Sequence, residues 1–197
     1  WLTNEIGSRE VLPLADIQIP GVHNIENYMA AIAATVTMVE SKSVLQVAHT
    51  FRGAEHRNEF VRKVNGVSYY NSSIDSSPNR TKATLSVFNK KVILIAGGKD
   101  KGIPYDAVGP VITEKVKYLI LIGKTGPKIL EAVRAAGGSV PSVFCSTYQE
   151  AVETAAHVAQ AGDNVVLSPA STSFDMFQNF EERGNTFKKY VNQLSVK

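Results

Sequence analysis

Three unbroken apolar runs constrain the fold of this chain most: "KVILIAGG" (91–98), "YLILIG" (118–123) and "NVVLSPA" (164–170). Each run has the length of a β-strand and no alternating polar positions, so both faces of each strand must be covered. Segments with helical spacing of apolar residues separate the runs. Strands that alternate with helices form parallel sheets through crossover connections. The sequence therefore predicts an α/β domain with a doubly wound, mostly parallel sheet.

Further elements of this domain are expected from residue 59 onward. "EFVRKVNGVSYYN" predicts a hairpin with Asn65 and Gly66 at its tight turn, and the helix after it has Ser77 as N-cap and Pro78 at its first position. Helices are also expected over 104–115, 126–138 and 147–163, with a strand over 139–146 and a long final helix. In this final helix a spacing of three and four places five residues on one face: Phe177, Phe180, Gly184, Phe187 and Val191.

Residues 1–50 have a different pattern. They hold a short polar start and an alanine-rich helix that begins near His23, which is too little for an independent core. We expect this segment to be the tail of a larger domain, and residues 51–197 to form the α/β domain. The boundary is placed within "AHTFRGAEHR" (48–57), where the composition changes.

Composition excludes several classes of protein. The net charge of +3 is small and the Lys and Arg residues are scattered, which argues against a nucleic-acid partner. No stretch approaches the roughly 18 apolar residues of a membrane span, and the start "WLTNEIGSRE" lacks the pattern of a signal peptide. The single cysteine, Cys145, permits no disulfide within the chain and is interpreted as a buried structural residue. A reducing, cytoplasmic setting is expected.

Two groups of polar residues near the boundary are candidate ligand contacts. Asn24 and Asn27 are three residues apart, so they share a helix face, where amides either cap the helix or pair with the edge of a base. His56 and Arg57 precede the first strand of the α/β domain. An arginine at such a place is either a solvated charge or a clamp for a phosphate.

Two further groups follow strands of the predicted sheet. "AGGKDKG" (96–102) lets the backbone approach a ligand and offers Lys99 or Lys101 to an anion, although the same sequence is typical of a simple turn. It matches neither the P-loop nor the G-x-G-x-x-G pattern. Ser168 and residues 171–173 end the last strand and are expected to form a turn of exposed hydroxyls at a helix N-terminus, followed by Phe174 and Phe180. Turn and core residues are the alternative interpretation.

Both groups lie at the carboxyl ends of parallel strands, which is the edge where ligands bind in open α/β sheets. Their agreement predicts a site for an anionic molecule held by Lys101 and the Ser173 turn. The loop "NSSIDSSPNRT" (71–81) reaches the same edge. Its hydroxyl groups and Asp75 are interpreted first as turn and cap residues. The alternative interpretation is that they line a bound ligand.

Taken together, five segments resemble the Mur ligase family: "GVHNIENYMAAIAA", "EHRNEF", "NGVSYYNSS", "ILIAGGKDKG" and "LSPASTSFDMFQNFEERGNTF". The resemblance runs from about residue 11 to the C-terminus. It implies the end of a central ATP-binding domain followed by the complete Rossmann-like C-terminal domain. It also implies an ATP- and Mg²⁺-dependent enzyme of peptidoglycan synthesis that joins D-glutamate to UDP-N-acetylmuramoyl-L-alanine. The fragment lacks the P-loop and magnesium ligands of the family, so we expect it to be inactive alone, monomeric, and without a metal site or a catalytic residue of its own.

The resemblance assigns roles to individual residues. Asn24 and Asn27 match amides that contact adenine, and His56 and Arg57 match the pair at the domain boundary, where the arginine reaches the nucleotide. The residues that match the D-glutamate pocket are Lys101, Ser173, Phe174, Phe180 and Ser76.

One loop departs from the family pattern. The family often has "NDSKATN" where this chain has "NSSIDSS", so Ser72 replaces an aspartate and Ile74 replaces a lysine. Asp75 and Lys99 are candidates to compensate for the lost groups, and a different way of holding the ligands is the alternative.

Two other functions are weighed against this one. The first is a related amide ligase that adds another amino acid, or glutamate to a folate; Lys101 and the "SPASTSFDMF" ending argue against it. The second is a stand-alone α/β ligand-binding module without catalysis.

Overall fold

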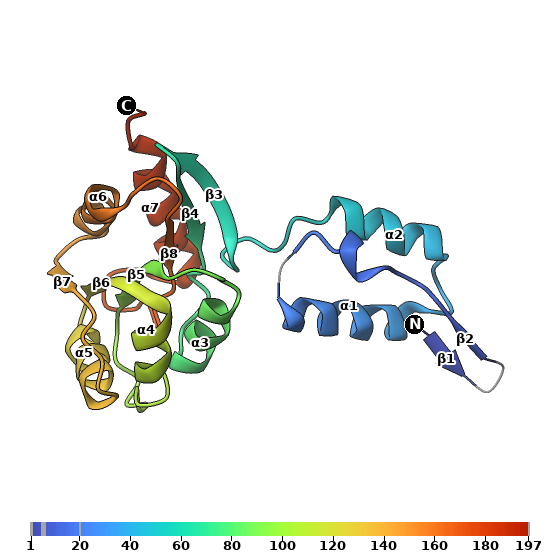
Figure 1. Cartoon of the computed structure of the whole chain (residues 1–197), viewed down its shortest axis with the longest axis horizontal. Coiled ribbons are helices and arrows are strands. Elements are labelled where there is room, and N and C mark those ends of the chain that lie inside the picture. The colour runs from blue at the N-terminus through green and yellow to red at the C-terminus, as the bar shows by residue number, and fades with distance from the viewer. Residues whose placement is uncertain (1, 5–6, 20, 197) are drawn as a thin grey trace. The chain divides into compact units, whose positions relative to one another are not determined.

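The computed structural model describes residues 2–4, 7–19 and 21–196, and the chain forms two compact units, residues 1–53 and 54–197. Among the described residues of the first unit, buried Leu12, Tyr28 and Ala48 form a small core. Its elements, seen in Figure 1, are β1 (Leu2–Asn4), β2 (Gly7–Arg9), a 3₁₀ turn (Leu14–Asp16), α1 (Val22–Thr35) and α2 (Ser41–Thr50).

The second unit is built on one six-stranded sheet, with the strand order β3-β4-β8-β5-β6-β7. Only β3 and β4 pair in antiparallel fashion, and the other four pairings are parallel. This confirms the predicted mostly parallel sheet. The strands are β3 (Glu59–Val64), β4 (Val67–Asn71), β5 (Val92–Gly97), β6 (Val116–Ile122), β7 (Ser142–Cys145) and β8 (Asn164–Leu167).

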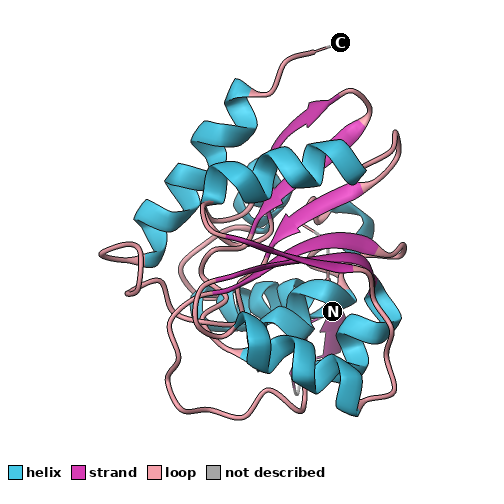
Figure 2. Cartoon of the chain, turned by 90° about the vertical axis from the view of Figure 1, so that its left-hand side faces the viewer, coloured by secondary structure: helices cyan, strands magenta, loops and turns pink. Residues whose placement is uncertain are grey.

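Helices cover both faces of the sheet, as Figure 2 shows. The apolar cluster on one face joins the strands to α6 and α7, and the cluster on the other face joins them to α3, α4 and α5. Every residue of β5 is buried, as its unbroken apolar sequence predicts for a central strand. The helices are α3 (Pro78–Ser86), α4 (Gly109–Lys115), α5 (Gly126–Ala135), α6 (Tyr148–Val158) and α7 (Phe180–Gln193).

Local sequence explains several of these elements. Asn65 and Gly66 both have positive φ, 49° and 81°, as a two-residue hairpin turn with the twist of the flanking strands requires. This confirms the predicted hairpin. Ser77 is the N-cap residue of α3, and Pro78 follows in the first turn of the helix, as expected. Within the described residues, no helix has the length and hydropathy to cross a membrane.

Two predicted helix starts are wrong. The helix expected from Pro104 begins only at Gly109. The Tyr105 side chain is buried in the core, and the backbone that places it there is not helical. The final helix begins at Phe180, so Phe177 lies outside it. The Asn179 side chain accepts a hydrogen bond from Glu182 N (2.7 Å), and this N-cap fixes the start of α7.

Candidate functional site

The carboxyl ends of the central parallel strands meet at one edge of the sheet. Asn71 at the end of β4 pairs with Leu167 at the end of β8, and Leu167 pairs with Ile95 of β5. The loops that leave this edge cover residues 72–77, 98–108 and 168–179. They carry the segments in which the sequence predicts an anion site, so the fold brings these segments together.

Backbone contacts join the second and third of these loops. Gly97 N donates to Pro169 O (2.8 Å) and Lys99 N donates to Thr172 O (2.9 Å). A Cβ at Gly98 would lie against Thr172 O, and Gly98 has a φ of 153°. The glycine pair therefore allows the backbone of this loop to approach the backbone of the loop after β8, a contact that the sequence did not indicate.

The hydroxyl groups after β8 are buried, so the prediction of an exposed hydroxyl turn at a helix N-terminus is wrong. Ser171, Thr172 and Ser173 are 1%, 5% and 3% exposed. Ser171 Oγ hydrogen-bonds Tyr105 Oη (2.8 Å) and Thr125 Oγ1 (2.7 Å). These hydroxyls satisfy one another inside the protein, and α7 begins seven residues beyond Ser173.

The two phenylalanines predicted for the amino-acid site lie in different environments. Phe174 directly follows the buried hydroxyls and is 59% exposed. Phe180 is half-buried at the start of α7, where its ring meets the His56 ring edge to face at 5.8 Å between centroids. Phe174 thus lies at the surface of the loop, whereas Phe180 is packed between α7 and the segment before β3.

Lys101 is exposed on a loop that its neighbours shape. Asp100 Oδ1 accepts a hydrogen bond from Gly102 N (2.8 Å), and Asp100 Oδ2 pairs with Lys128 Nζ of α5. The hydrogen bond from Lys128 is the main cause that lowers the pKa of Asp100. Lys101 forms no ion pair with any residue in the described part of the chain. Its ammonium group is therefore available to an anion.

The loop after β4 is organised by a buried carboxylate. Asp75 is 4% exposed, and its Oδ2 accepts hydrogen bonds from Thr84 Oγ1 and Ser168 Oγ, both at 2.7 Å. Burial raises the pKa of Asp75, and the hydroxyls of Thr84, Ser168 and Ser72 oppose this shift only in part. The carboxylate is engaged inside the protein, while Ser76 beside it is half-exposed. Asp75 thus links the loop to α3 and to the end of β8.

This raised pKa predicts a pH dependence of stability. The folded state binds the Asp75 proton more tightly than the unfolded state, whose carboxyl titrates near 3.8, so unfolding free energy should fall as the pH rises from 3.8 to the folded pKa. Asp75→Asn has no proton to lose there and should show a smaller decrease. Urea unfolding from about pH 4 to about pH 7 measures this, with the exposed Asp106→Asn as control. Parallel curves for the variant and the unsubstituted chain would contradict the expectation.

His56 is buried in a polar network, whereas its neighbour Arg57 is exposed. The residue has a φ of 62° and is 5% exposed, and its Nδ1 lies 2.9 Å from Asn71 Nδ2. Asn71 also donates to Glu59 Oε2 (2.9 Å), and Lys188 Nζ donates to Glu59 Oε1 (3.0 Å). Burial disfavours the Glu59 charge, but these hydrogen bonds and that of His56 N outweigh it and lower the pKa of Glu59. Arg57, in contrast, is exposed.

Asn24 and Asn27 lie in the first unit, on one face of α1. Asn27 Nδ2 donates to Asn24 Oδ1 at 3.5 Å, so the two amides lie side by side, as their spacing predicts. The N-cap of α1 is Gly21, and its carbonyl accepts from Asn24 N (3.0 Å). Neither amide therefore occupies the N-cap position of α1.

Sequence reasoning missed Arg183. This residue is 1% exposed, and its guanidinium contacts the loops after β4 and β8. The signal was present in the sequence, because Arg183 falls three residues after Phe180 and four before Phe187, on the apolar face of α7. A charged residue at such a position must find buried hydrogen-bond partners.

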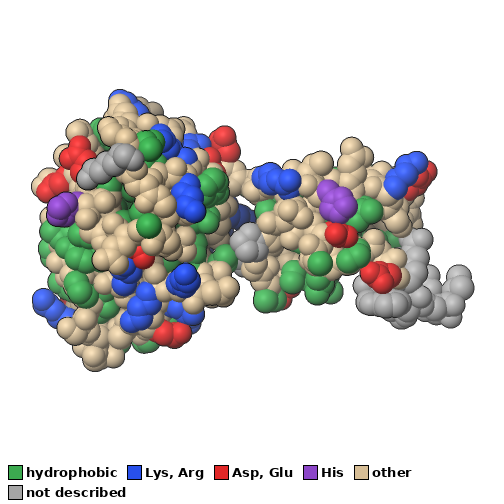
Figure 3. Space-filling model, turned by 45° about the horizontal axis from the view of Figure 1, so that its top comes forward, with side chains coloured by type: hydrophobic (Ala, Val, Ile, Leu, Met, Phe, Trp, Pro, Cys, Tyr) green, Lys and Arg blue, Asp and Glu red, His purple; other side chains and the backbone are tan. Residues whose placement is uncertain are grey.

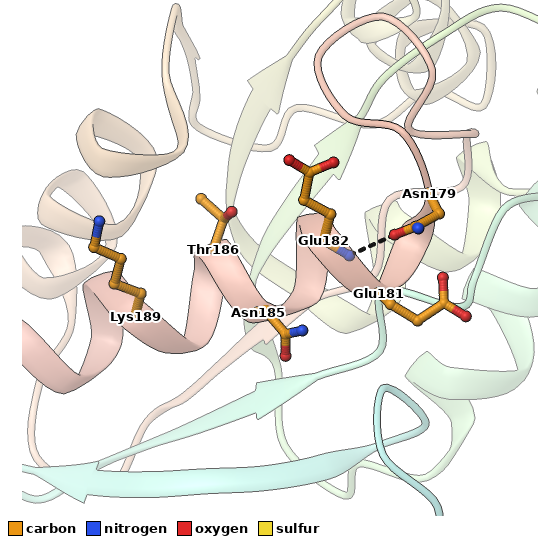
Figure 4. Close-up of a pocket in the computed structure, with 6 residues that line it drawn as sticks. All are labelled: Asn179, Glu181, Glu182, Asn185, Thr186 and Lys189. Carbon is orange, nitrogen blue, oxygen red and sulfur yellow. Dashed lines mark hydrogen bonds between the residues drawn. The ribbon is translucent and has the colours of Figure 1, made fainter.

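The described surface of the second unit carries mixed charge and a depression on α7. Acidic and basic side chains are interspersed over the face of the second unit seen in Figure 3. A shallow depression of about 430 Å³ runs along α7 (Figure 4) and includes none of the predicted amino-acid-site residues. It is lined by Asn179, Glu181, Glu182, Asn185, Thr186 and Lys189.

Comparison with known sequences points to one family. Residues 56–171 match the family described as "Mur ligase, glutamate ligase domain". The chain is 57% identical, over 94% of its length, to UDP-N-acetylmuramoylalanine–D-glutamate ligase of Ruminiclostridium cellulolyticum. It is 56% identical, over 95% of its length, to the ligase of the same name from Acetivibrio thermocellus. The chain spans about 41% of the length of these curated relatives.

Solved structures share the fold at low sequence identity. UDP-N-acetylmuramate–alanine ligase of Thermotoga maritima matches with a TM-score of 0.65 and 14% identity, over 89% of this chain and 39% of that one. Folylpolyglutamate synthase of Mycobacterium tuberculosis matches with a TM-score of 0.60 and 13% identity, over 86% and 41% of the two chains.

Proposed function

This chain belongs to the Mur ligase family, and from that premise we propose that it is the C-terminal part of an ATP-dependent ligase of peptidoglycan synthesis. The reaction joins D-glutamate to UDP-N-acetylmuramoyl-L-alanine. The high identity to relatives named for this reaction, over nearly the whole chain, carries the proposal. Residues 1–53 would then be the end of the central ATP-binding domain, and residues 54–197 the domain that receives the amino acid.

The proposed D-glutamate site lies at the carboxyl edge of the sheet. Lys101 forms no ion pair among the described residues, so it can offer its ammonium group to a carboxylate of the amino acid. Ser76 and Ser173 stand on the loops after β4 and β8, and Phe174 and Phe180 supply apolar surface. Ser173 is only 3% exposed, so its hydroxyl group would reach D-glutamate only after the loop after β8 opens.

Nucleotide binding is proposed for four residues. The paired amides of Asn24 and Asn27 can donate to and accept from the edge of adenine. Exposed Arg57 has the donors that a phosphate requires, and the hydrogen bond between Asn71 and His56 holds the residue next to it in place. Among the described residues, no cluster of three or more His, Cys, Asp or Glu could hold a metal ion. We propose that Mg²⁺ is bound mainly by the part of the enzyme outside this chain.

The chemistry of such a ligase proceeds in two steps. The γ-phosphoryl group of ATP is transferred to the carboxylate of UDP-N-acetylmuramoyl-L-alanine, which gives an acyl phosphate and ADP. The amine of D-glutamate then attacks the acyl carbon. Phosphate leaves as the amide bond forms, and the amine gives up a proton. This chain contributes position: it holds the amine in line with the acyl carbon, an effect that can supply several kcal/mol of the barrier. We also propose that the enzyme acts as a cytoplasmic monomer.

A chimeric enzyme tests the proposal. This chain replaces the matching C-terminal part of the Ruminiclostridium cellulolyticum ligase, so that the rest of the enzyme comes from the relative. We expect phosphate release that requires ATP, UDP-N-acetylmuramoyl-L-alanine and D-glutamate together, with L-glutamate as the stereochemical control. The 197-residue chain alone should release no phosphate.

Two results would contradict the proposal. A folded chimera that releases no phosphate with D-glutamate would exclude this substrate. Activity with another amino acid, or with a folate acceptor and glutamate, would assign the chain to a different amide ligase of the same fold.

A further inference from the structure

Arg183 is the largest side chain that the second unit encloses completely. It lies in the second turn of α7, on the helix face that also carries Phe187. Enclosing a guanidinium group is costly unless each N–H finds an acceptor. The acceptors of its N–H groups therefore identify the parts of the fold that Arg183 connects.

The three nitrogens of Arg183 reach two separate loops. Nε donates to Ser73 Oγ (2.9 Å) and Nη2 donates to Ser73 O (2.7 Å). Nη1 donates to Ser171 O (2.9 Å). Ser73 Oγ in turn donates to Phe180 O (2.8 Å), which ties the loop after β4 to the start of α7. One side chain thus fixes the loops after β4 and β8 relative to each other and to the helix.

The charge of Arg183 is not neutralised by a close carboxylate. No acidic group in the described ranges lies within ion-pair distance of it. Burial lowers the pKa of Arg183, and Tyr148 and Asp175 act against this shift. A rigid fork of donors that serves neutral oxygens on two loops is a means of fixing geometry, which an apolar residue of similar size would not provide.

We propose that Arg183 is a positioning residue of the amino-acid site. It holds Ser73 and Ser171 so that Ser76 and Ser173, which follow them by three and two residues, are presented in a fixed arrangement beside the loop of Lys101. This inference rests on the proposed function, because the proposed function makes D-glutamate the ligand of these loops. Arg183 itself is enclosed and does not touch the substrate.

Arg183→Lys in the chimeric enzyme tests the role, because lysine keeps the charge but cannot serve the same three acceptors in a fork. We expect the KM for D-glutamate to rise about tenfold, while the KM for ATP and kcat stay within about threefold of their original values. Arg134→Lys, at an exposed position on α5, is the matched control and should leave all three constants unchanged. Ser73→Ala removes the acceptor of Nε and should act in the same direction, with an effect that is less than additive in the double variant.

An unchanged KM for D-glutamate in the folded Arg183→Lys variant would overturn the proposal. Equal increases in the KM values for D-glutamate and ATP would overturn it too, because they indicate general loss of structure.

Amide NMR spectra of the 197-residue chain keep this test separate from the proposed function. If the unsubstituted chimera is inactive, the proposed function fails, and with it the substrate-positioning role. Shifts of residues 72–76 and 171–173 in Arg183→Lys would then still show whether Arg183 sets the two loops.

Discussion

Replacing Gly184 by alanine is expected to lower the free energy of unfolding of the second unit by about 3 kcal/mol. Helix propensity alone gives the opposite sign, because alanine in a helix interior is more favourable than glycine by about 1 kcal/mol. The environment of Gly184 decides the outcome. A Cβ there would overlap His56 Nδ1 and lie 3.0 Å from Asn71 Nδ2. Neither side chain has room to move, since His56 is 5% and Asn71 0% exposed.

Displacing His56 has further costs. The hydrogen bond between Asn71 and His56 would be lost, and a buried amide that loses a partner costs about 1–3 kcal/mol. Urea unfolding followed through the amide signals of residues 54–196 measures the change. Asn185→Ala, at the next and exposed position of α7, is the control and should be neutral or slightly stabilising. A Gly184→Ala variant as stable as this control would show that His56 can move freely.

The same contact connects stability to the proposed nucleotide site. Gly184 allows α7 to approach the segment that carries His56 and Arg57, which was assigned to the nucleotide by resemblance. In the chimeric enzyme, Gly184→Ala should therefore raise the KM for ATP as well as destabilise the second unit.

The sheet of this protein is predictable because its signals are local. Unbroken apolar runs indicate buried strands, and Asn65-Gly66 indicates a tight hairpin turn, without any knowledge of distant residues. The start of α7 was also readable, because Asn179 followed by Glu182 is a capping pattern. The regular spacing of Phe177 and Phe180 suggested an earlier start, but the cap decides where the helix begins.

The interior of the candidate site was not predictable from local signals. The residues at 171–173 resemble a solvated hydroxyl turn in sequence, yet Ser171 is enclosed by Tyr105 and Thr125, which are 66 and 46 residues away. Asp75 is likewise satisfied by Ser168, 93 residues away. Hydroxyl groups are compatible with water or with each other, and only the tertiary fold determines which partner they have.

Lys101→Ala is expected to raise the KM for D-glutamate about a hundredfold in the chimeric enzyme. A hydrogen bond to a charged group contributes about 1.5–3 kcal/mol, and D-glutamate offers two carboxylates. Three other lysines of the second unit are already engaged: Lys117 with Asp163, Lys128 with Asp100 and Lys188 with Glu59. Lys101 is exposed and has no such partner among the described residues, so its charge is free for the substrate.

Two controls separate substrate binding from general effects of charge. Lys90→Ala removes an exposed lysine just before β5, at the opposite end of that strand, and should change the KM by less than about twofold. Lys101→Arg keeps the charge with a different donor geometry and should lie between alanine and lysine. Stability of Lys101→Ala should stay within about 0.5 kcal/mol of the original, because the side chain is exposed. If Lys101→Ala behaves like Lys90→Ala, the substrate carboxylate is held elsewhere, and exposed Lys99 on the same loop becomes the residue to replace.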